Sequence, residues 1–199
     1  MKRIYLAAAV ALLTGAIGLT FLINKTDSVS ASPAVATVNV PPLYGAADAF
    51  VLSCMDYRLT DETAKYFQDE LGLKNNYDYV VLAGASLGVN NTKYPNWGQT
   101  FWQHLDTAIA LHGIHEVIVM DHRNCGAYKV LLGKEFLPDA GAAQLKEETV
   151  VHKEQLDMLA KAIHEKYPKL EVSTLLMSLD GHVDEIGHVE AVKPADEKH

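Results

Sequence analysis

The chain has 199 residues, of which 49% are hydrophobic, 21% charged and 8% aromatic, and this is the composition of an ordinary globular protein with a buried core. Seventeen Lys and Arg residues stand against 25 Asp and Glu residues, and the formal net charge of -8 excludes the basic field of a general nucleic-acid-binding protein. Two cysteines are too few for a scaffold built on disulfides. We therefore expect one ordinary globular domain, and the charge predicts no nucleic-acid partner.

The N-terminal segment has the pattern of an export signal. Two basic residues, Lys2 and Arg3, precede an uncharged apolar run of 20 residues over 4–23, and polar residues follow it. We interpret residues 1–36 as a signal peptide cleaved after the small residues 34–36, or as a retained membrane anchor, because about 20 apolar residues also span a bilayer. Either interpretation predicts an exported, periplasmic protein, with a membrane as partner only if the segment is retained.

The remaining sequence alternates between strand and helix patterns. We expect a linker or arm over 37–48, the folded domain over 49–190 and an acidic tail over 191–199. Short apolar runs predict strands at 49–53, 79–83, 116–120 and 171–177. Helical spacing and stop signals predict helices at about 60–71, with an N-cap at Thr60-Asp61 and a stop at Gly72, and at 100–112, 126–132 and 147–167.

This alternation predicts a single α/β domain in which helices flank a mostly parallel central sheet. No element is predicted after residue 181. Ligands of such sheets bind beyond the carboxyl ends of the strands, so the residues that follow each strand are the candidates for function.

Both cysteines of the chain lie at predicted strand ends. Cys54 follows the first strand, and His122 and Cys125 follow the third. Two thiolates and one imidazole from neighbouring strand ends would form a three-ligand zinc site, and three protein ligands with an open position are typical of catalytic rather than structural zinc. A disulfide between the two cysteines is the simpler alternative in an oxidising compartment.

Two charged residues accompany the first cysteine. Asp56 and Arg58 stand two residues apart, so the guanidinium is expected to keep the carboxylate ionised. That carboxylate would either orient a water at the metal or occupy the fourth metal position itself. The alternative is a surface ion pair that contributes little.

The spacing of these residues resembles the motifs of a known family. Cys-x-Asp-x-Arg followed by His-x-x-Cys-Gly is similar to the motif pair of the β-class carbonic anhydrases, with Cys54, Asp56 and Arg58 in the first motif and His122 and Cys125 in the second. The resemblance implies a zinc lyase that hydrates CO2 reversibly to bicarbonate and a proton through zinc-bound hydroxide, as a homodimer or a multiple of dimers. It assigns Cys54, His122 and Cys125 to the metal, and Asp56 and Arg58 to catalysis.

Proton export in such an enzyme needs an acceptor beyond the metal. The candidates, which the sequence does not rank, are Tyr57, His104, His112 and Asp121.

One segment departs from the family pattern. Residues 82–86 read Leu-Ala-Gly-Ala-Ser where most of the family has Arg-Asn-Ala-Gly-Asn or similar. The change removes an Arg and two Asn side chains, so the substrate pocket is expected to be less polar and to lack the regulatory bicarbonate site of part of the family. A zinc hydrolase of COS or CS2 on the same scaffold, and a zinc-binding homologue without catalysis, are therefore the alternative functions.

Overall fold

The computed structural model describes residues 45–193. The predicted signal or anchor, most of the linker and the end of the acidic tail lie outside the described residues. Over 45–193, no helix combines the length and the apolar character that crossing a membrane would require. Residues 45–48 and 191–193 belong to no helix or strand.

A five-stranded sheet forms the centre of the domain, with the strand order β2-β1-β3-β4-β5. Strands β1 to β4 pair in parallel, and β5 pairs antiparallel with β4 at one edge. The strands are β1 (Ala49–Cys54), β2 (Tyr77–Leu82), β3 (Glu116–His122), β4 (Glu171–Met177) and β5 (Val183–Val189). The expected α/β class and the mostly parallel sheet are thus confirmed.

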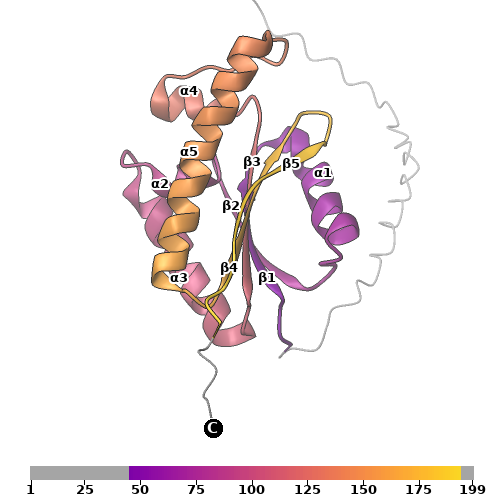
Figure 1. Cartoon of the computed structure of the whole chain (residues 1–199), viewed down its shortest axis with the longest axis vertical. Coiled ribbons are helices and arrows are strands. Elements are labelled where there is room, and N and C mark those ends of the chain that lie inside the picture. The colour runs from indigo at the N-terminus through magenta and orange to yellow at the C-terminus, as the bar shows by residue number, and fades with distance from the viewer. Residues whose placement is uncertain (1–44, 194–199) are drawn as a thin grey trace, which may run out of the picture. The chain divides into compact units, whose positions relative to one another are not determined.

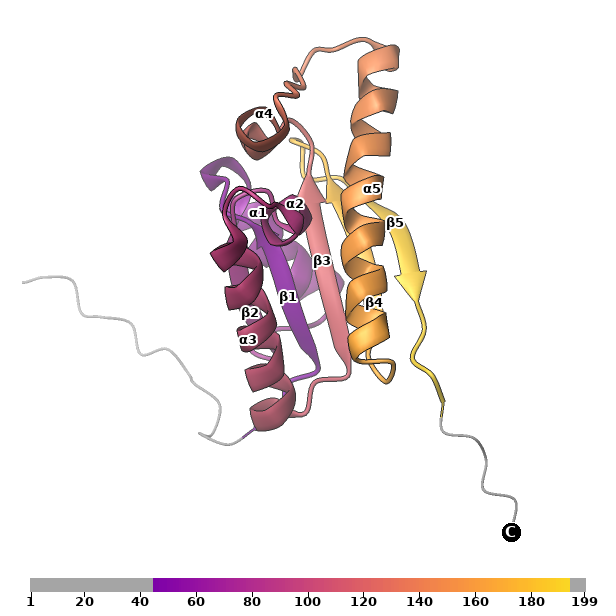
Figure 2. The same cartoon turned by 90° about the vertical axis from the view of Figure 1, so that its left-hand side faces the viewer.

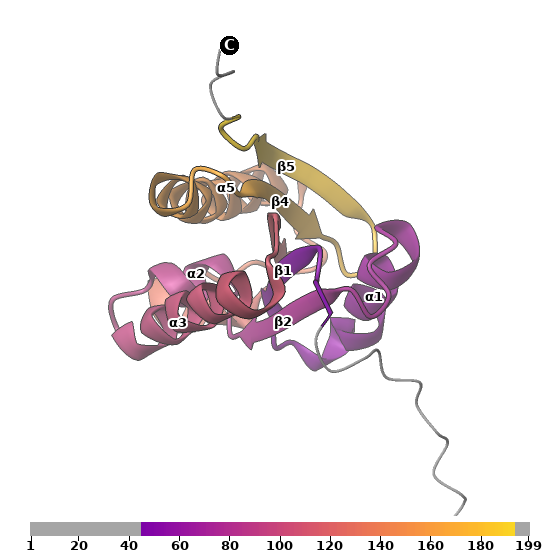
Figure 3. The same ribbon diagram turned by 90° about the horizontal axis from the view of Figure 1, so that it is seen from below.

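Helices cover both faces of the sheet. On one face lie α2 (Ser86–Asn90), α3 (Pro95–His112) and the long α5 (Ala142–Lys166), and on the other lies α1 (Thr60–Lys65) with its π-helical continuation Tyr66–Glu70 (Figures 1 and 3). The short α4 (Gly126–Leu132) lies beyond the arrowhead end of β3 (Figure 2). This three-layer arrangement leaves the carboxyl ends of the parallel strands free for a site.

Alternation along the strands divides the core in two. Val117 and Val119 of β3 pack in the cluster under α3 and α5, whereas Ile118 and Met120 pack in the cluster on the α1 face. These side chains are almost completely buried. Burial of each side chain stabilises the fold by about 1.5 to 3 kcal/mol relative to exposure. Because both faces of these strands are buried, their sequences are continuous apolar runs, and such runs predict them.

The helix boundaries differ from the prediction at three N-termini. Thr60 and Asp61 do not cap α1; they form its first turn, and a short 3-10 turn, Tyr57–Leu59, precedes it. Helix α3 begins at Pro95 rather than at residue 100, and α5 begins at Ala142 rather than at residue 147. Proline is favourable in a first helical turn because its missing N–H has no intrahelical acceptor there.

Two elements were not predicted. Helix α2 occupies part of the stretch that was expected to be a loop, and it packs so closely on α3 that a Cβ on Gly98 would lie 2.7 Å from the carbonyl oxygen of Val89. Strand β5 falls where no element was expected. Its residues are largely half-exposed and mix polar with apolar types, as on an edge strand that faces solvent.

Candidate metal centre

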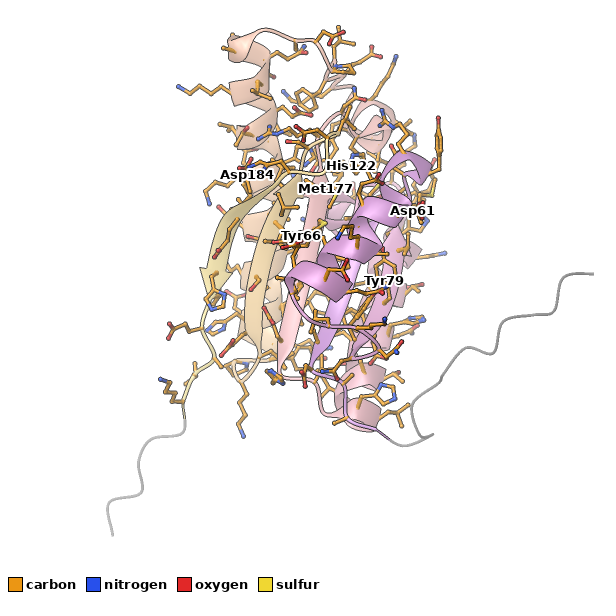
Figure 4. The ribbon with its side chains drawn as sticks, turned by 90° about the vertical axis from the view of Figure 1, so that its right-hand side faces the viewer. Asp61, Tyr66, Tyr79, His122, Met177 and Asp184 are labelled. Carbon is orange, nitrogen blue, oxygen red and sulfur yellow. The ribbon has the colours of Figure 1, made fainter. Side chains whose placement is uncertain are left out.

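The carboxyl ends of β1 and β3 bring the two sequence motifs together. Cys54 is the last residue of β1, and His122 is the last residue of β3, the strand beside it. Cys125 lies three residues further on, at the N-cap position of α4. Figure 4 shows His122 at the end of the sheet, beside its register partner Met177 of β4.

The three predicted metal ligands form one cluster. The sulfur atoms of Cys54 and Cys125 and a ring nitrogen of His122 all lie within 4.8 Å of one another. The two sulfurs are 3.8 Å apart and both cysteines are free, so no disulfide joins them. Two sulfurs bonded to one tetrahedral zinc at about 2.3 Å would lie about 3.8 Å apart, so the observed spacing fits zinc.

The hydrogen bonding of His122 leaves its Nε2 atom free to bind a metal ion. Its Nδ1 donates a hydrogen bond of 2.8 Å to the carbonyl oxygen of Arg123, which leaves Nε2 as the atom with a free lone pair. The side chain of His122 is 4% exposed, and Nε2 has no hydrogen-bond partner. A buried polar atom without a partner is unfavourable, and a metal ion would satisfy it.

The pKa values of the two thiols are shifted in opposite directions. The hydrogen bond from Cys125 lowers the pKa of Cys54, and the backbone N–H of Gly84, 3.3 Å from the Cys54 sulfur, acts in the same direction. The same hydrogen bond, together with burial, raises the pKa of Cys125. A divalent cation would stabilise both sulfurs as thiolates, and the ligand set would then neutralise its charge.

Asp56 and Arg58 form a close pair beside these ligands. Arg58 donates from Nε to one carboxylate oxygen at 2.9 Å and from a terminal nitrogen to the other at 2.7 Å. These hydrogen bonds lower the pKa of Asp56 to about 2. Its Oδ2 atom lies 3.7 Å from Nε2 of His122, and the carboxylate is not a member of the three-ligand cluster.

A residue that the sequence did not single out supports this pair. Asn124 accepts hydrogen bonds from Arg58 on its side-chain oxygen, at 2.7 Å, and on its carbonyl oxygen, at 3.1 Å. Its backbone is in the left-handed region with φ of 56°, and its N–H donates to the buried Glu148 at 2.5 Å. Asn124 stands between His122 and Cys125 in the second motif, and this position is the feature of the sequence that could have identified it.

A cleft of about 530 Å³ opens beside the cluster. Asp56 and Tyr57 supply polar atoms at its wall, and the rest of the lining is mainly apolar. The apolar lining consists of Met55, Ala83, Tyr94, Trp97, Ala127, Val130 and Leu131. Ala83 belongs to the segment that departs from the family pattern, so the departure does face the cleft.

The proton-acceptor candidates separate in space. Tyr57 lines the cleft and is 86% exposed. His104 and His112 line a different cavity, where His112 is 2.7 Å from a carboxylate oxygen of Asp78. Asp121 is buried and accepts hydrogen bonds on both oxygens. Among these four candidates, only Tyr57 lines the cleft.

The chain is similar to one known family and to several known proteins. A family described as "Putative carbonic anhydrase" matches residues 46–187. Uncharacterized proteins of Rickettsia conorii and Rickettsia bellii are 43% identical over 140 residues, which is 70% of this chain and 72% and 82% of theirs.

Among solved structures, a carbonic anhydrase from Glaciozyma antarctica is 17% identical, with a TM-score of 0.48 over 73% of this chain and 85% of that one. A tetrameric β-carbonic anhydrase from Sordaria macrospora is 14% identical, with a TM-score of 0.48 over 73% of this chain and 83% of that one.

Proposed function

Because the chain belongs to the family described as "Putative carbonic anhydrase", we propose that it is a zinc-dependent enzyme that catalyses the reversible hydration of CO2 to bicarbonate and a proton. The observation that carries the proposal is the cluster of Cys54, His122 and Cys125, with the carboxylate of Asp56 beside it. Structural zinc sites use four protein ligands, whereas three ligands leave a position for chemistry.

Cys54, Cys125 and Nε2 of His122 would hold the ion. When bound, zinc lowers the pKa of a water ligand to near 7 and so supplies a nucleophile at neutral pH, as it does in carbonic anhydrases that hold zinc with three histidines. The Gly84 N–H stabilises the Cys54 thiolate, and the carbonyl oxygen of Arg123 orients the imidazole.

Asp56 is placed to orient water rather than to bind protons. With a pKa of about 2, it is ionised at neutral pH and can only accept hydrogen bonds. Arg58 holds both of its oxygens, and Asn124 in turn holds Arg58. A fixed acceptor near the metal position selects one orientation of a water O–H, which is a positioning contribution to the reaction. The two hydrogen bonds from Arg58 support this role over that of a fourth metal ligand.

The lining of the cleft supports a small uncharged substrate. CO2 is linear and apolar, and the mainly apolar walls of the cleft, which include Ala83, Trp97 and Val130, offer it van der Waals contact. The same lining favours COS or CS2, which are larger apolar analogues, and hydrolysis of these is the second candidate function.

The test is a pair of assays on zinc-loaded protein, with metal content measured on the same sample. Stopped-flow CO2 hydration at a rate well above that of free zinc, with about one zinc per chain, is the expected result. Sulfide release from COS or CS2 without CO2 hydration would shift the function to the second candidate. Bound zinc with neither activity would contradict both.

Assembly and location are further parts of the proposal. We expect a homodimer or a multiple of dimers, which sedimentation would test, and a monomer would contradict it. We also expect export to the periplasm, where the enzyme would interconvert CO2 and bicarbonate for uptake or pH control. The apolar run near the N-terminus supports export, and recovery of the protein from the cytoplasmic fraction would contradict it.

A further inference from the structure

The carboxylate of Asp121 accepts hydrogen bonds from three segments of the chain: the start of α2, helix α4 and helix α5. Asp121 directly precedes His122 on β3 and is 1% exposed. Four donors reach it: Ser86 N at 3.0 Å, Ser86 Oγ at 2.7 Å, Tyr128 OH at 2.8 Å and His152 Nδ1 at 2.9 Å. A buried carboxylate is unfavourable unless such donors compensate for lost water, so the arrangement indicates a specific role.

Strand alternation explains how one strand end serves two purposes. Val117, Val119 and Asp121 point to the face covered by α2 and α5, whereas His122 is one residue further on and points away from that face. Asp121 can therefore bond to helices behind the cluster while its neighbour takes part in the cluster. These hydrogen bonds explain why the apolar strand β3 ends in a polar residue, Asp121, on this face.

The first connection runs through the loop between β2 and α2. Gly84 and Ala85 both have positive φ, of 80° and 41°, and Ala85 adopts an unfavourable conformation with ψ of -103°. A conformation of this kind persists only where its surroundings hold it, and the next residue, Ser86, is bonded twice to Asp121. The same loop directs the Gly84 N–H to the sulfur of Cys54.

The second connection runs through α4. Tyr128 is completely buried, donates its hydroxyl hydrogen to Asp121 and donates its backbone N–H to the carbonyl oxygen of Cys125 at 3.2 Å. Asp121 is thus linked to the backbone of Cys125 through Tyr128, to the sulfur of Cys54 through the loop from Ser86 back to Gly84, and to His122 through the chain itself.

We propose that Asp121 is a positioning residue of the metal centre, which acts through Ser86 on the Gly84 N–H and through Tyr128 on Cys125. The inference rests on the zinc centre of the proposed function and not on the reaction that the centre performs. Residues that orient metal ligands typically change metal affinity by 10- to 100-fold when they are substituted. The role assigned here would apply to any substrate of the cleft.

The test measures zinc affinity rather than activity. Ser86→Ala removes one donor to Asp121 and keeps the backbone N–H, and Tyr128→Phe removes another with little change in volume. Competition with a chromophoric chelator should show about 10-fold or greater weakening of zinc binding in each variant. In Co(II)-loaded protein, the thiolate-to-cobalt band should shift, because each variant would move either the Gly84 N–H relative to the Cys54 sulfur or the backbone of Cys125.

Thr174→Val is the matched control. Thr174 is 2% exposed and donates a partly buried hydrogen bond of 3.0 Å to the carbonyl oxygen of Gly187, away from the cluster. This variant should lower the unfolding midpoint as Ser86→Ala does, but it should leave zinc affinity and the cobalt spectrum unchanged. Equal effects of Ser86→Ala and Thr174→Val on zinc affinity would overturn the positioning role.

The wild-type protein separates the two proposals. If it does not bind zinc, the proposed function fails. If it binds zinc and both Ser86→Ala and Tyr128→Phe bind with a dissociation constant within about 2-fold of wild type, only the role of Asp121 fails.

Discussion

The ion pair between Asp56 and Arg58 allows a quantitative prediction. Replacing Asp56 by Asn removes the carboxylate charge, and replacing Arg58 by Met removes the guanidinium while keeping much of its aliphatic stem. The pKa of Asp56 falls from 3.8 to about 2, chiefly because Arg58 donates hydrogen bonds to it. At 1.36 kcal/mol for each pKa unit, the difference corresponds to roughly 2.5 kcal/mol as an upper bound.

Screening by solvent makes the energy of this ion pair smaller than the upper bound. The side chains of Asp56 and Arg58 are 16% and 34% exposed, so we expect a coupling energy of about 1 to 1.5 kcal/mol between them. Urea unfolding of wild type, both single variants and the double variant, each with excess zinc, measures this energy. The exposed pair Lys65 and Asp69 serves as a control and should show a smaller coupling.

The sign of the pH dependence follows from the lowered pKa. A carboxylate with a depressed folded-state pKa stabilises the protein above its ordinary pKa, and this stabilisation is lost as the pH falls through the folded-state value. The coupling should therefore be constant from about pH 8 to about pH 5.5 and should decrease below about pH 4. A coupling near zero at neutral pH, or one that already decreases between about pH 8 and 6, would refute this interpretation of the pair.

Three further predictions concern the site and its loop. Cys54→Ser and His122→Ala should each lose zinc and CO2 hydration together, in metal analysis and stopped-flow assays; hydration without zinc would contradict the ligand assignment. Asp56→Ala should keep its zinc but hydrate CO2 about 100-fold or more slowly, and full activity would remove the role given to the carboxylate. Gly84→Ala should lower the free energy of unfolding by more than Gly113→Ala does. Both glycines have positive φ, and for this reason alone Gly113→Ala should cost about 1 kcal/mol. At Gly84 the new Cβ would also lie 2.8 Å from a side-chain carbon of α4. Equal losses in urea unfolding would contradict the steric argument.

The centre of the fold was predictable because burial on both faces leaves a strong pattern in the sequence. Strand β4 and helix α4 have the predicted bounds, and β3 continues two residues past its predicted end into Asp121 and His122. The convergence of Cys54 with His122 and Cys125 followed from the rule that parallel strands present their carboxyl ends at one edge. The structure brings the three side chains together in one cluster.

The elements that were missed lack such a pattern. Strand β5 lies at an edge and is half-exposed, so it shows no apolar run. The start of α3 contains Pro95 and Gly98, which in isolation are typical of loops, and Gly98 is accounted for only by its close approach to Val89. Contacts between one element and another are not visible to local pattern analysis.

The same reasoning applies to the surroundings of the cluster. The sequence offered Asp121 only as a candidate proton acceptor, because its donors Ser86, Tyr128 and His152 come from three separate segments. A polar residue that ends an apolar strand does signal a need for partners, but it does not identify them. The links between Asn124, Arg58 and Glu148 were hidden for the same reason.

X-ray absorption at the zinc edge of the loaded protein tests the metal centre most directly. The expected ligand shell contains two sulfurs at about 2.3 Å, one imidazole nitrogen at about 2.0 to 2.1 Å and one oxygen at about 2.0 to 2.2 Å, from Cys54, Cys125, His122 and the open position. His122→Ala should lose the nitrogen or the metal altogether. A zinc shell without sulfur, or a purified protein in which Cys54 and Cys125 are joined as a disulfide and bind no zinc, would contradict the proposed centre.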